Sequence, residues 1–135
     1  MRVLVTGSAG HLGEGLVRTL RERRHEVVGL DLLDSPSTTH VGSVSDPDFV
    51  RRCLRGVELV IHAATLHKPH MVTHSRQAFV ETNIAGTLAV LEAALAAGVS
   101  GVVFSSTTSA FGAALRPTDG EPVRAVMDGR CGRDP

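Results

Sequence analysis

Short apolar runs alternate along the chain with longer segments in which apolar residues recur every three or four positions. The runs at 2–6, 26–31, 58–62 and 101–105 are rich in Val, Leu and Ile, and a weaker run lies at 40–42. Runs without apolar–polar alternation are typical of strands that are buried on both faces of a sheet. The sequence therefore predicts five short strands.

Helical periodicity fills the intervals between these runs. Leu12, Leu16 and Leu20 recur at four-residue spacing after the first run, which predicts an amphipathic helix. Asp46 followed by Pro47 is a helix start signal. The short helix that follows is expected to bury Phe49, Val50 and Leu54.

Residues 76–97 carry the strongest helical pattern, which ends at Gly98. The inward stripe of this helix is predicted to hold Phe79, Asn83, Thr87, Leu91 and Leu95. Strands that alternate with helices in this way favour a parallel sheet covered on both faces. The predicted fold class is α/β, a doubly wound parallel sheet of the Rossmann type.

The pattern weakens after Gly112. The last residues are rich in Pro, Gly, Arg and Asp and have neither a helical nor a strand period. We therefore expect a Rossmann domain over residues 1–115 and an irregular tail over residues 116–135. The predicted sheet ends early, so the expected fold is a Rossmann sheet that is truncated on its C-terminal side.

Charge and cysteine content exclude several function classes. The 14 basic and 14 acidic residues balance to a net charge of zero, which predicts neither nucleic-acid nor membrane-surface binding. Cys53 and Cys131 lack metal-ligand spacing and are expected to be free thiols. The first strand begins without a basic leader or cleavage site, which favours a cytoplasmic protein.

Three glycines mark the first strand-to-helix turn. Gly7 permits a tight turn, Gly10 allows a diphosphate to approach the backbone, and Gly13 allows the helix to lie against the sheet. The start of a helix offers free N–H groups and a positive dipole end to such an anion. The alternative is a tight turn that binds no ligand.

Asp31 makes the nucleotide interpretation stronger. It ends the second predicted strand, about twenty residues beyond the glycines, where a carboxylate accepts hydrogen bonds from the hydroxyls of an adenosine ribose. The same charge repels a 2′-phosphate, which favours NAD over NADP. Asp34 in the following loop could complicate that preference.

Four segments resemble the extended short-chain dehydrogenase/reductases, in particular the NAD-dependent epimerase/dehydratase family. They are "VTGSAGHLG", "VIHAAT", "ETNIAGTLAVLEAA" and "VVFSSTTSAFG", and the resemblance covers about residues 1–115. It implies an NAD-dependent enzyme that acts on a sugar or sugar nucleotide by hydride transfer. It also implies a possible homodimer, built in part on the long helix.

The resemblance assigns roles to particular positions. It implies that Asn83 is a structural and proton-relay residue and that Thr107 stands at the position of the catalytic serine. Ser43 and Val44 stand where the family contacts adenine, with Ser43 replacing its usual Asp. The implied cofactor-binding set is Gly7, Ala9, Gly10, His11, Leu12, Gly13, Asp31, Ser43, Val44, His62, Ala63, Ala64, Asn83 and Ser105.

One departure from the family pattern bears on catalysis. The family uses a Tyr and, four residues later, a Lys as its acid–base pair, whereas this sequence has no tyrosine and its single lysine is Lys68. General acid–base catalysis contributes roughly 10²- to 10⁴-fold. We therefore expect no efficient turnover from this chain alone, and a truncated or frame-shifted family member is the simplest explanation. A non-catalytic NAD-binding or interaction module is the alternative.

Histidines gather between the fourth strand and the long helix. His62, His67, His70 and His74 lie within thirteen residues, and the last two would share a helical face. With no Cys or Glu nearby to complete a zinc site, no metal is expected. The favoured interpretation is a loop on the substrate side, with His67 or His70 facing the groove.

Overall fold

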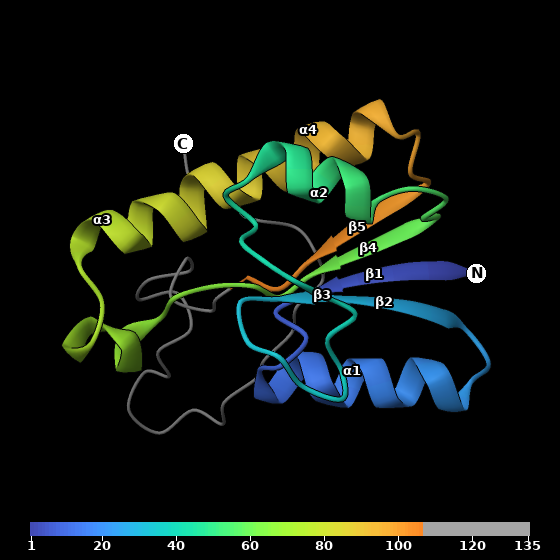
Figure 1. Cartoon of the computed structure of the whole chain (residues 1–135), viewed down its shortest axis with the longest axis horizontal. Coiled ribbons are helices and arrows are strands. Elements are labelled where there is room, and N and C mark those ends of the chain that lie inside the picture. Colours follow the sequence, from blue (N-terminus) through green and yellow to red (C-terminus); the bar gives the residue numbers. More distant parts are fainter. Residues whose placement is uncertain (107–135) are drawn as a thin grey trace, which may run out of the picture. The chain divides into compact units, whose positions relative to one another are not determined.

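The computed structural model describes residues 1–106 of the chain. Five parallel strands form one sheet in the order β3-β2-β1-β4-β5 (Figure 1). The strands are β1 (Arg2–Thr6), β2 (Glu26–Asp31), β3 (His40–Val41), β4 (Leu59–His62) and β5 (Gly101–Phe104). The prediction of a parallel Rossmann sheet is therefore confirmed, and the expected boundary at residue 115 falls outside the described residues.

Helices cover both faces of this sheet. Figure 1 shows α1 (His11–Glu22) on one side and α2 (Pro47–Cys53) and α4 (Thr87–Ala96) on the other. The predicted long helix is present, but it consists of α3 (Arg76–Phe79), a π-helical stretch η2 (Val80–Gly86) and α4. A short 3₁₀ helix, η1 (Lys68–Val72), precedes it.

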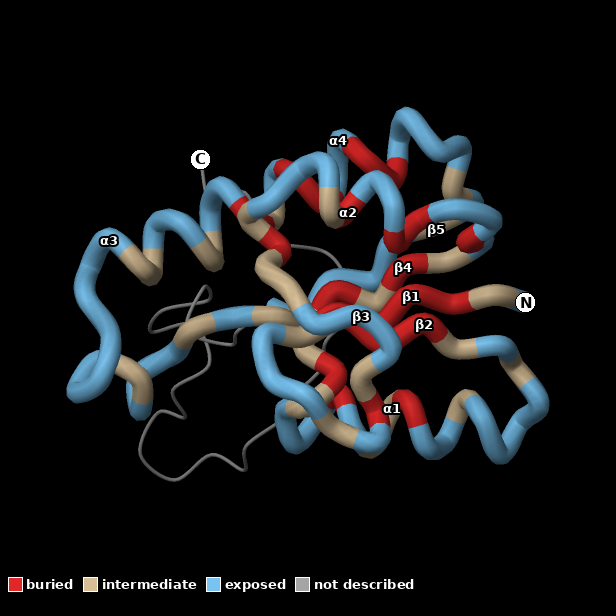
Figure 2. The backbone as a smooth tube through the Cα atoms, in the orientation of Figure 1, coloured by how far each residue is buried: buried red, intermediate tan, exposed pale blue. Residues whose placement is uncertain are grey.

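The sheet separates two apolar layers, and its central strands are buried on both sides (Figure 2). Val3 and Val5 pack with Val17 of α1. Leu4, between them in the sequence, faces the opposite layer, which α2 and α4 complete. This burial on both faces explains why β1 reads as an unbroken apolar run.

Local signals place the helix ends correctly. The Asp46 carboxylate accepts hydrogen bonds from the backbone N–H groups of Asp48 and Phe49, both at 3.0 Å. Gly98 adopts φ +66° immediately after the last turn of α4. Both observations confirm the predicted start of α2 and the predicted end of α4.

The predicted inward stripes of two helices are partly wrong. Leu12 is half exposed, and α1 instead buries Gly13 and Val17. In α4, Leu95 is 83% exposed, and the buried face consists of Ala89, Val90, Ala93 and Ala94. Small residues face inward in α4 because α2 lies close against it, leaving no room for leucine.

The exposed side of the long helix is apolar. Ile84, Leu88 and Leu91 are exposed together with Leu95, and Val103 of β5 is also exposed. By length and composition alone, the helix Arg76–Ala96 could cross a bilayer. Its other face packs into the protein core, which is the position of a core helix in a doubly wound fold.

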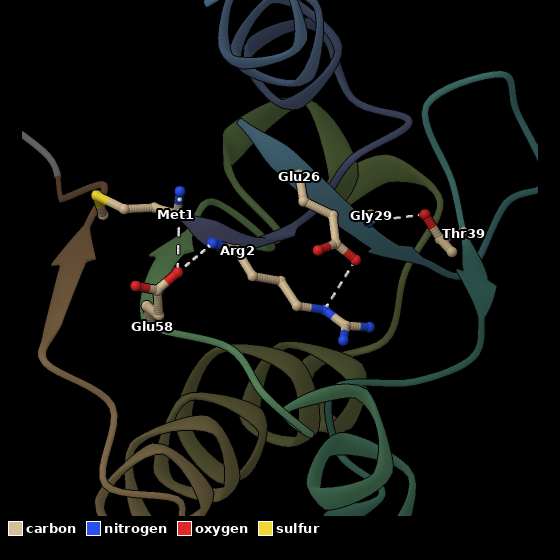
Figure 3. Close-up of polar contacts among 6 residues, drawn as sticks. All are labelled: Met1, Arg2, Glu26, Gly29, Thr39 and Glu58. Carbon is tan, nitrogen blue, oxygen red and sulfur yellow. Dashed lines mark hydrogen bonds and ion pairs between the residues drawn. The ribbon is translucent and has the colours of Figure 1, made fainter. Parts of the chain in front are cut away.

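Polar contacts fix the strand ends (Figure 3). The backbone N–H of Arg2 donates to Glu58 at 2.6 Å, while the Arg2 guanidinium lies 3.3 Å from Glu26 at the start of β2. At the sheet edge, the N–H of Gly29 donates to the hydroxyl of Thr39 at 3.1 Å. The exposed ion pairs contribute only about 0–1 kcal/mol each, so the core supplies most of the stability.

Two glycines of α1 differ sharply in their surroundings. A Cβ atom on Gly13 would lie 1.9 Å from the carbonyl oxygen of Gly7, whereas a Cβ on Gly15 would meet nothing within 4 Å. The missing side chain of Gly13 therefore allows α1 to approach the turn that follows β1.

These surroundings predict opposite effects of one substitution. Gly13→Ala should lower the free energy of unfolding by about 1–3 kcal/mol, because the turn must move to admit the methyl group. Gly15→Ala should raise it by about 0.5–1 kcal/mol through helix propensity. Urea unfolding of the two variants measures both effects. Equal effects would contradict the close approach of α1.

Candidate functional site

A cavity of about 960 Å³ opens at the carboxyl ends of the strands. Its walls come from the segments that follow β1, β2, β3, β4 and β5, which contribute residues such as Gly10, Asp31, Val44, Ala64 and Ser105. Ligands of open α/β sheets bind at this edge, beside the point where the strand order reverses. The order β3-β2-β1-β4-β5 places that reversal between β1 and β4, directly beneath the cavity.

The turn after β1 is constrained by its own backbone. Gly7 has φ +71°, and a Cβ there would lie 2.8 Å from the backbone nitrogen of Ala64. The Gly7 N–H donates to the carbonyl of Leu30 at 2.8 Å, which joins the turn to β2. Gly7 and Gly13 are therefore required by the fold itself.

Gly10 differs, because the protein does not require it to be a glycine. Its backbone is extended at φ −76°, and a Cβ there would meet only the Gly7 carbonyl oxygen, at 3.2 Å. The space in front of Gly10 belongs to the cavity. This space lies beside the first turn of α1, and the N–H groups of that turn have no acceptor within the helix. This combination fits an anion held against the backbone.

Asp31 connects the turn to the end of β2. One carboxylate oxygen accepts the N–H of Ala9 at 3.0 Å, and the other accepts the N–H of Leu33 at 3.0 Å. A carboxylate oxygen has more than one lone pair, so both oxygens can still accept hydroxyl protons from a ribose. Asp31 therefore holds the turn in place and also lines the cavity.

Ser43 and Val44 line the cavity after β3. The hydroxyl of Ser43 accepts the N–H of Ser45 at 3.0 Å, and Val44 is 94% buried as part of the apolar core. The Ser45 hydroxyl in turn donates to the carbonyl of Glu81 at 2.7 Å, which fixes this loop to the long helix. An apolar side chain on a braced loop suits the face of a flat aromatic base.

His62 lies beneath the cavity and does not line it. It is 99% buried, and its ring bonds to Thr6 of β1 at 2.6 Å through Nδ1 and to Thr87 of α4 at 3.0 Å through Nε2. The expectation that His62 lines the groove is therefore corrected. Its side chain points into the interface between the sheet and α4.

The hydrogen-bond count assigns the protons in this network. The Thr6 hydroxyl oxygen already accepts the N–H groups of Ala63 and Ala64, both at 3.2 Å, so it donates its own proton to Nδ1 of His62. The ring therefore carries its proton on Nε2 and donates it to Thr87. Burial lowers the pKa of His62, which favours this neutral form.

Asn83 also acts from outside the cavity lining. Its amide oxygen accepts the N–H of Leu66 at 2.8 Å, and its amide nitrogen donates to the Leu66 carbonyl at 2.8 Å. This pair of bonds fixes the loop after β4 to the long helix. The structure gives Asn83 the structural half of its expected role.

The structure brings most of the expected site residues to one cavity. Those in the lining are Gly7, Ala9, Gly10, His11, Leu12, Gly13, Asp31, Ser43, Val44, Ala63, Ala64 and Ser105. Thr107 lies outside the described residues, so its expected role stays a prediction.

The sequence did not reveal several cavity residues. Leu32 and Leu33 follow Asp31 and were missed because loop residues after a strand carry no periodic signal. The hydrogen bonds of two threonines to His62 were missed as well: Thr6 reads as an ordinary β-branched strand residue, and Thr87 was predicted only as part of the inward stripe of the long helix. These hydrogen bonds could have been predicted only by searching for polar residues on elements that pack against each other.

Comparison with known proteins assigns the family. The sequence model of the "NAD dependent epimerase/dehydratase family" matches residues 3–126. The chain belongs to this family. The matched region contains the whole described cavity, so the family's dependence on NAD agrees with the space in front of Gly10 and with the position of Asp31.

Individual relatives of this epimerase/dehydratase chain are similar over most of its length. A UDP-glucose 4-epimerase of Streptomyces lividans is 34% identical over an alignment of 122 residues, and the match covers 82% of this chain and 37% of the relative. A 3-beta-hydroxysteroid dehydrogenase of Mycolicibacterium neoaurum is 35% identical over an alignment of 118 residues, and the match covers 80% of this chain and 32% of the relative. The chain thus spans about a third of the length of these curated relatives.

A solved structure shares the fold. The crystal structure of a short-chain dehydrogenase/reductase superfamily protein from Agrobacterium tumefaciens, with bound NAD, has a TM-score of 0.76 and 31% identity. The match covers 92% of this epimerase/dehydratase chain and 39% of that one.

The buried network predicts a pH dependence of stability. Because burial lowers the pKa of His62, the unfolded chain takes up a proton at a higher pH than the folded chain does. Above the unfolded pKa of about 6.5, stability is unaffected; below it, stability falls by up to about 1.4 kcal/mol per pH unit until the lowered folded pKa is reached.

Urea unfolding between pH 8 and pH 5 measures this dependence. His62→Gln should show a smaller loss on acidification than the native chain. His25→Gln, which changes a histidine between α1 and β2, is the control and should keep the native dependence. An unchanged pH dependence in His62→Gln would contradict the assignment.

Proposed function

We propose that the chain is the NAD-binding part of an oxidoreductase of the epimerase/dehydratase type that acts on a sugar or sugar nucleotide. The observation that carries the proposal is the open space in front of Gly10, which no contact within the described protein explains. The amides at the start of α1 face that space. They would hold the diphosphate.

Other residues would then hold the remaining parts of the dinucleotide. Asp31 would accept the hydroxyls of the adenosine ribose, and Val44 would contact the adenine ring. A 2′-phosphate at the ribose would meet the Asp31 carboxylate, which favours NAD over NADP. Ala63, Ala64 and Ser105 line the part of the cavity beyond the phosphate loop, where the nicotinamide would lie.

NAD, when bound, supplies a hydride acceptor for oxidation of a substrate carbon. The chain's own residues would position that reaction. Asn83 holds the Leu66 loop beside the nicotinamide end, and the Thr6 hydroxyl fixes Ala63 and Ala64 at the cavity wall. The hydroxyl of Ser105 would contribute a hydrogen bond at the end of β5.

The proposal of a sugar substrate comes from relatives that are similar to this chain over the part that would bind the cofactor. Relatives of nearly equal identity are named for a sugar nucleotide and for a steroid, so they share this part of the chain while their substrates differ. The three histidines of the cavity lining, His67, His70 and His74, support a hydroxylated substrate over a steroid.

A second function is favoured by one sequence observation. The chain contains no tyrosine, and its single lysine, Lys68, lies in η1. It therefore lacks the acid–base pair of the family and could serve as a non-catalytic NAD-binding module. Formation of NADH with a sugar nucleotide would support the enzyme, whereas saturable NAD binding without NADH formation would support the module.

A single methyl group tests the phosphate site. Gly10→Ala should fold with a small loss of stability, because the extended backbone accepts alanine while the Cβ lies close to the Gly7 carbonyl oxygen, but its NAD affinity should fall about 10-fold or more as the Cβ enters the diphosphate space. Gly15→Ala, in the same helix but outside the cavity lining, should bind NAD like the native chain. Calorimetric titration with NAD measures both variants. Native affinity in Gly10→Ala would refute the proposal.

A pair of carboxylates tests the ribose site. Asp31→Ala should lower NAD affinity about 10-fold or more, because it removes charged hydrogen-bond acceptors, and should narrow the preference for NAD over NADP. Asp34→Ala removes a carboxylate of the neighbouring loop that lies outside the cavity lining, and should change neither property. Titration of each variant with NAD and with NADP gives the comparison, and equal behaviour of the two would argue against ribose recognition by Asp31.

A further inference from the structure

Three histidines form one wall of the cavity. His67, His70 and His74 all belong to its lining. The rings of His67 and His70 are 4.6 Å apart, those of His70 and His74 are 5.5 Å apart, and both pairs meet edge to face. We propose that this histidine wall binds an oxyanion, a phosphate or a carboxylate, that is carried by the substrate.

The charge of the surrounding segment favours an anion. From residue 59 to residue 80 the sequence contains no Asp or Glu, but it contains Lys68 and Arg76 as well as the histidines. Both cationic residues are exposed; Lys68 lies between His67 and His70 in the sequence, and Arg76 follows His74 by two residues. In a chain with zero net charge, this segment is a local positive region that attracts anions.

A backbone hydrogen bond fixes the tautomer of the His70 ring in this wall. The N–H of His67 donates to Nδ1 of His70 at 3.0 Å, so the proton of the His70 ring lies on Nε2. His70 is half-buried in η1, and Asn83 holds Leu66 immediately before this helix. The ring is therefore a positioned N–H donor, as recognition of an oxygen anion requires.

Two other ligands fit the histidine wall less well. Among residues 1–106, no group of three His, Cys, Asp or Glu side chains has the arrangement that a metal ion needs. The diphosphate of NAD is accounted for at the start of α1, at the turn after β1, whereas the histidine wall lies in the segment between β4 and the long helix. An oxyanion of a second molecule is the ligand that the local positive charge favours.

One carboxylate in this part of the lining has to be considered. Glu81 lines the cavity, but its side chain accepts a hydrogen bond from Gln77, and its carbonyl accepts one from Ser45 beyond β3. It lies in η2, whereas His74 precedes the start of α3 by two residues. Glu81 thus borders the adenine side of the cavity and leaves the histidine wall to the anion.

This inference rests on the proposed function and specifies its substrate. A sugar that carries a phosphate or a carboxylate should bind beside the nicotinamide, whereas a neutral sugar or a steroid lacks the group that the histidine wall recognises. A phosphate and a carboxylate both present oxygen anions that accept hydrogen bonds, and the experiment distinguishes between them.

The test is calorimetric titration of the full chain, with and without NAD, using three probes. The probes are glucose 1-phosphate, glucuronate and neutral glucose. We expect one or both anionic probes to bind more tightly than glucose by about 10-fold or more, since charged hydrogen bonds contribute roughly 1.5–3 kcal/mol. The anion that binds more tightly identifies the source.

Separate variants confirm where the probe binds. His70→Gln and His74→Gln should each weaken binding of the anionic probe at least about 5-fold and weaken binding of glucose and of NAD by less. His25→Gln, whose side chain lies outside the cavity lining, is the matched control and should behave like the native chain. Circular dichroism verifies that each variant is folded.

The outcomes separate this inference from the proposed function. Equal binding of glucose and the anions, or unchanged anion binding in both variants, overturns the histidine wall as an anion site even if NAD binds. Absence of NAD binding overturns the proposed function. Histidine-dependent anion binding in the chain without NAD would still support the site.

Discussion

The close packing of backbone at the carboxyl end of β1 is the constraint on which the structure depends. The carbonyl of Gly7 lies where a side chain on Gly13 would stand, and Gly7 itself lies against the backbone of Ala63 and Ala64. Three elements, β1, α1 and the segment after β4, meet here without intervening side chains. This approach directs the free amides of α1 into the cavity, so the fold and the proposed diphosphate site share one geometric cause.

A buried polar network supports that junction from below. Thr6 bonds to His62 and to the two amides that follow it, and His62 continues to Thr87 of the long helix. Buried polar groups are costly unless they are satisfied, and here Thr6 donates to His62 and His62 donates to Thr87. The network therefore joins β1, the end of β4 and α4 directly beneath the cavity.

The sequence was informative where local physics decides the structure. The strands, the Asp46 cap and the stop at Gly98 follow from patterns within a few residues of each position. The buried face of α4 follows from its distance to α2, so a leucine stripe was predicted where alanines are buried. Tertiary packing likewise decides the position of His62. The cytoplasmic location, the homodimer and the roles beyond residue 106 stay predictions.

Cofactor binding and proton transfer are separable in this chain. On the function proposed above, every group that would hold the dinucleotide lies between Gly7 and Ser105, within one compact unit that has its own core. The sequence contains no tyrosine, so the acid–base pair that the family resemblance implies is not among these residues. Since the amides at the start of α1 and the Asp31 carboxylate act on atoms remote from the reacting carbon, their affinity for the cofactor does not depend on that pair. On that proposal, these residues bind the cofactor whether or not an acid–base pair is present.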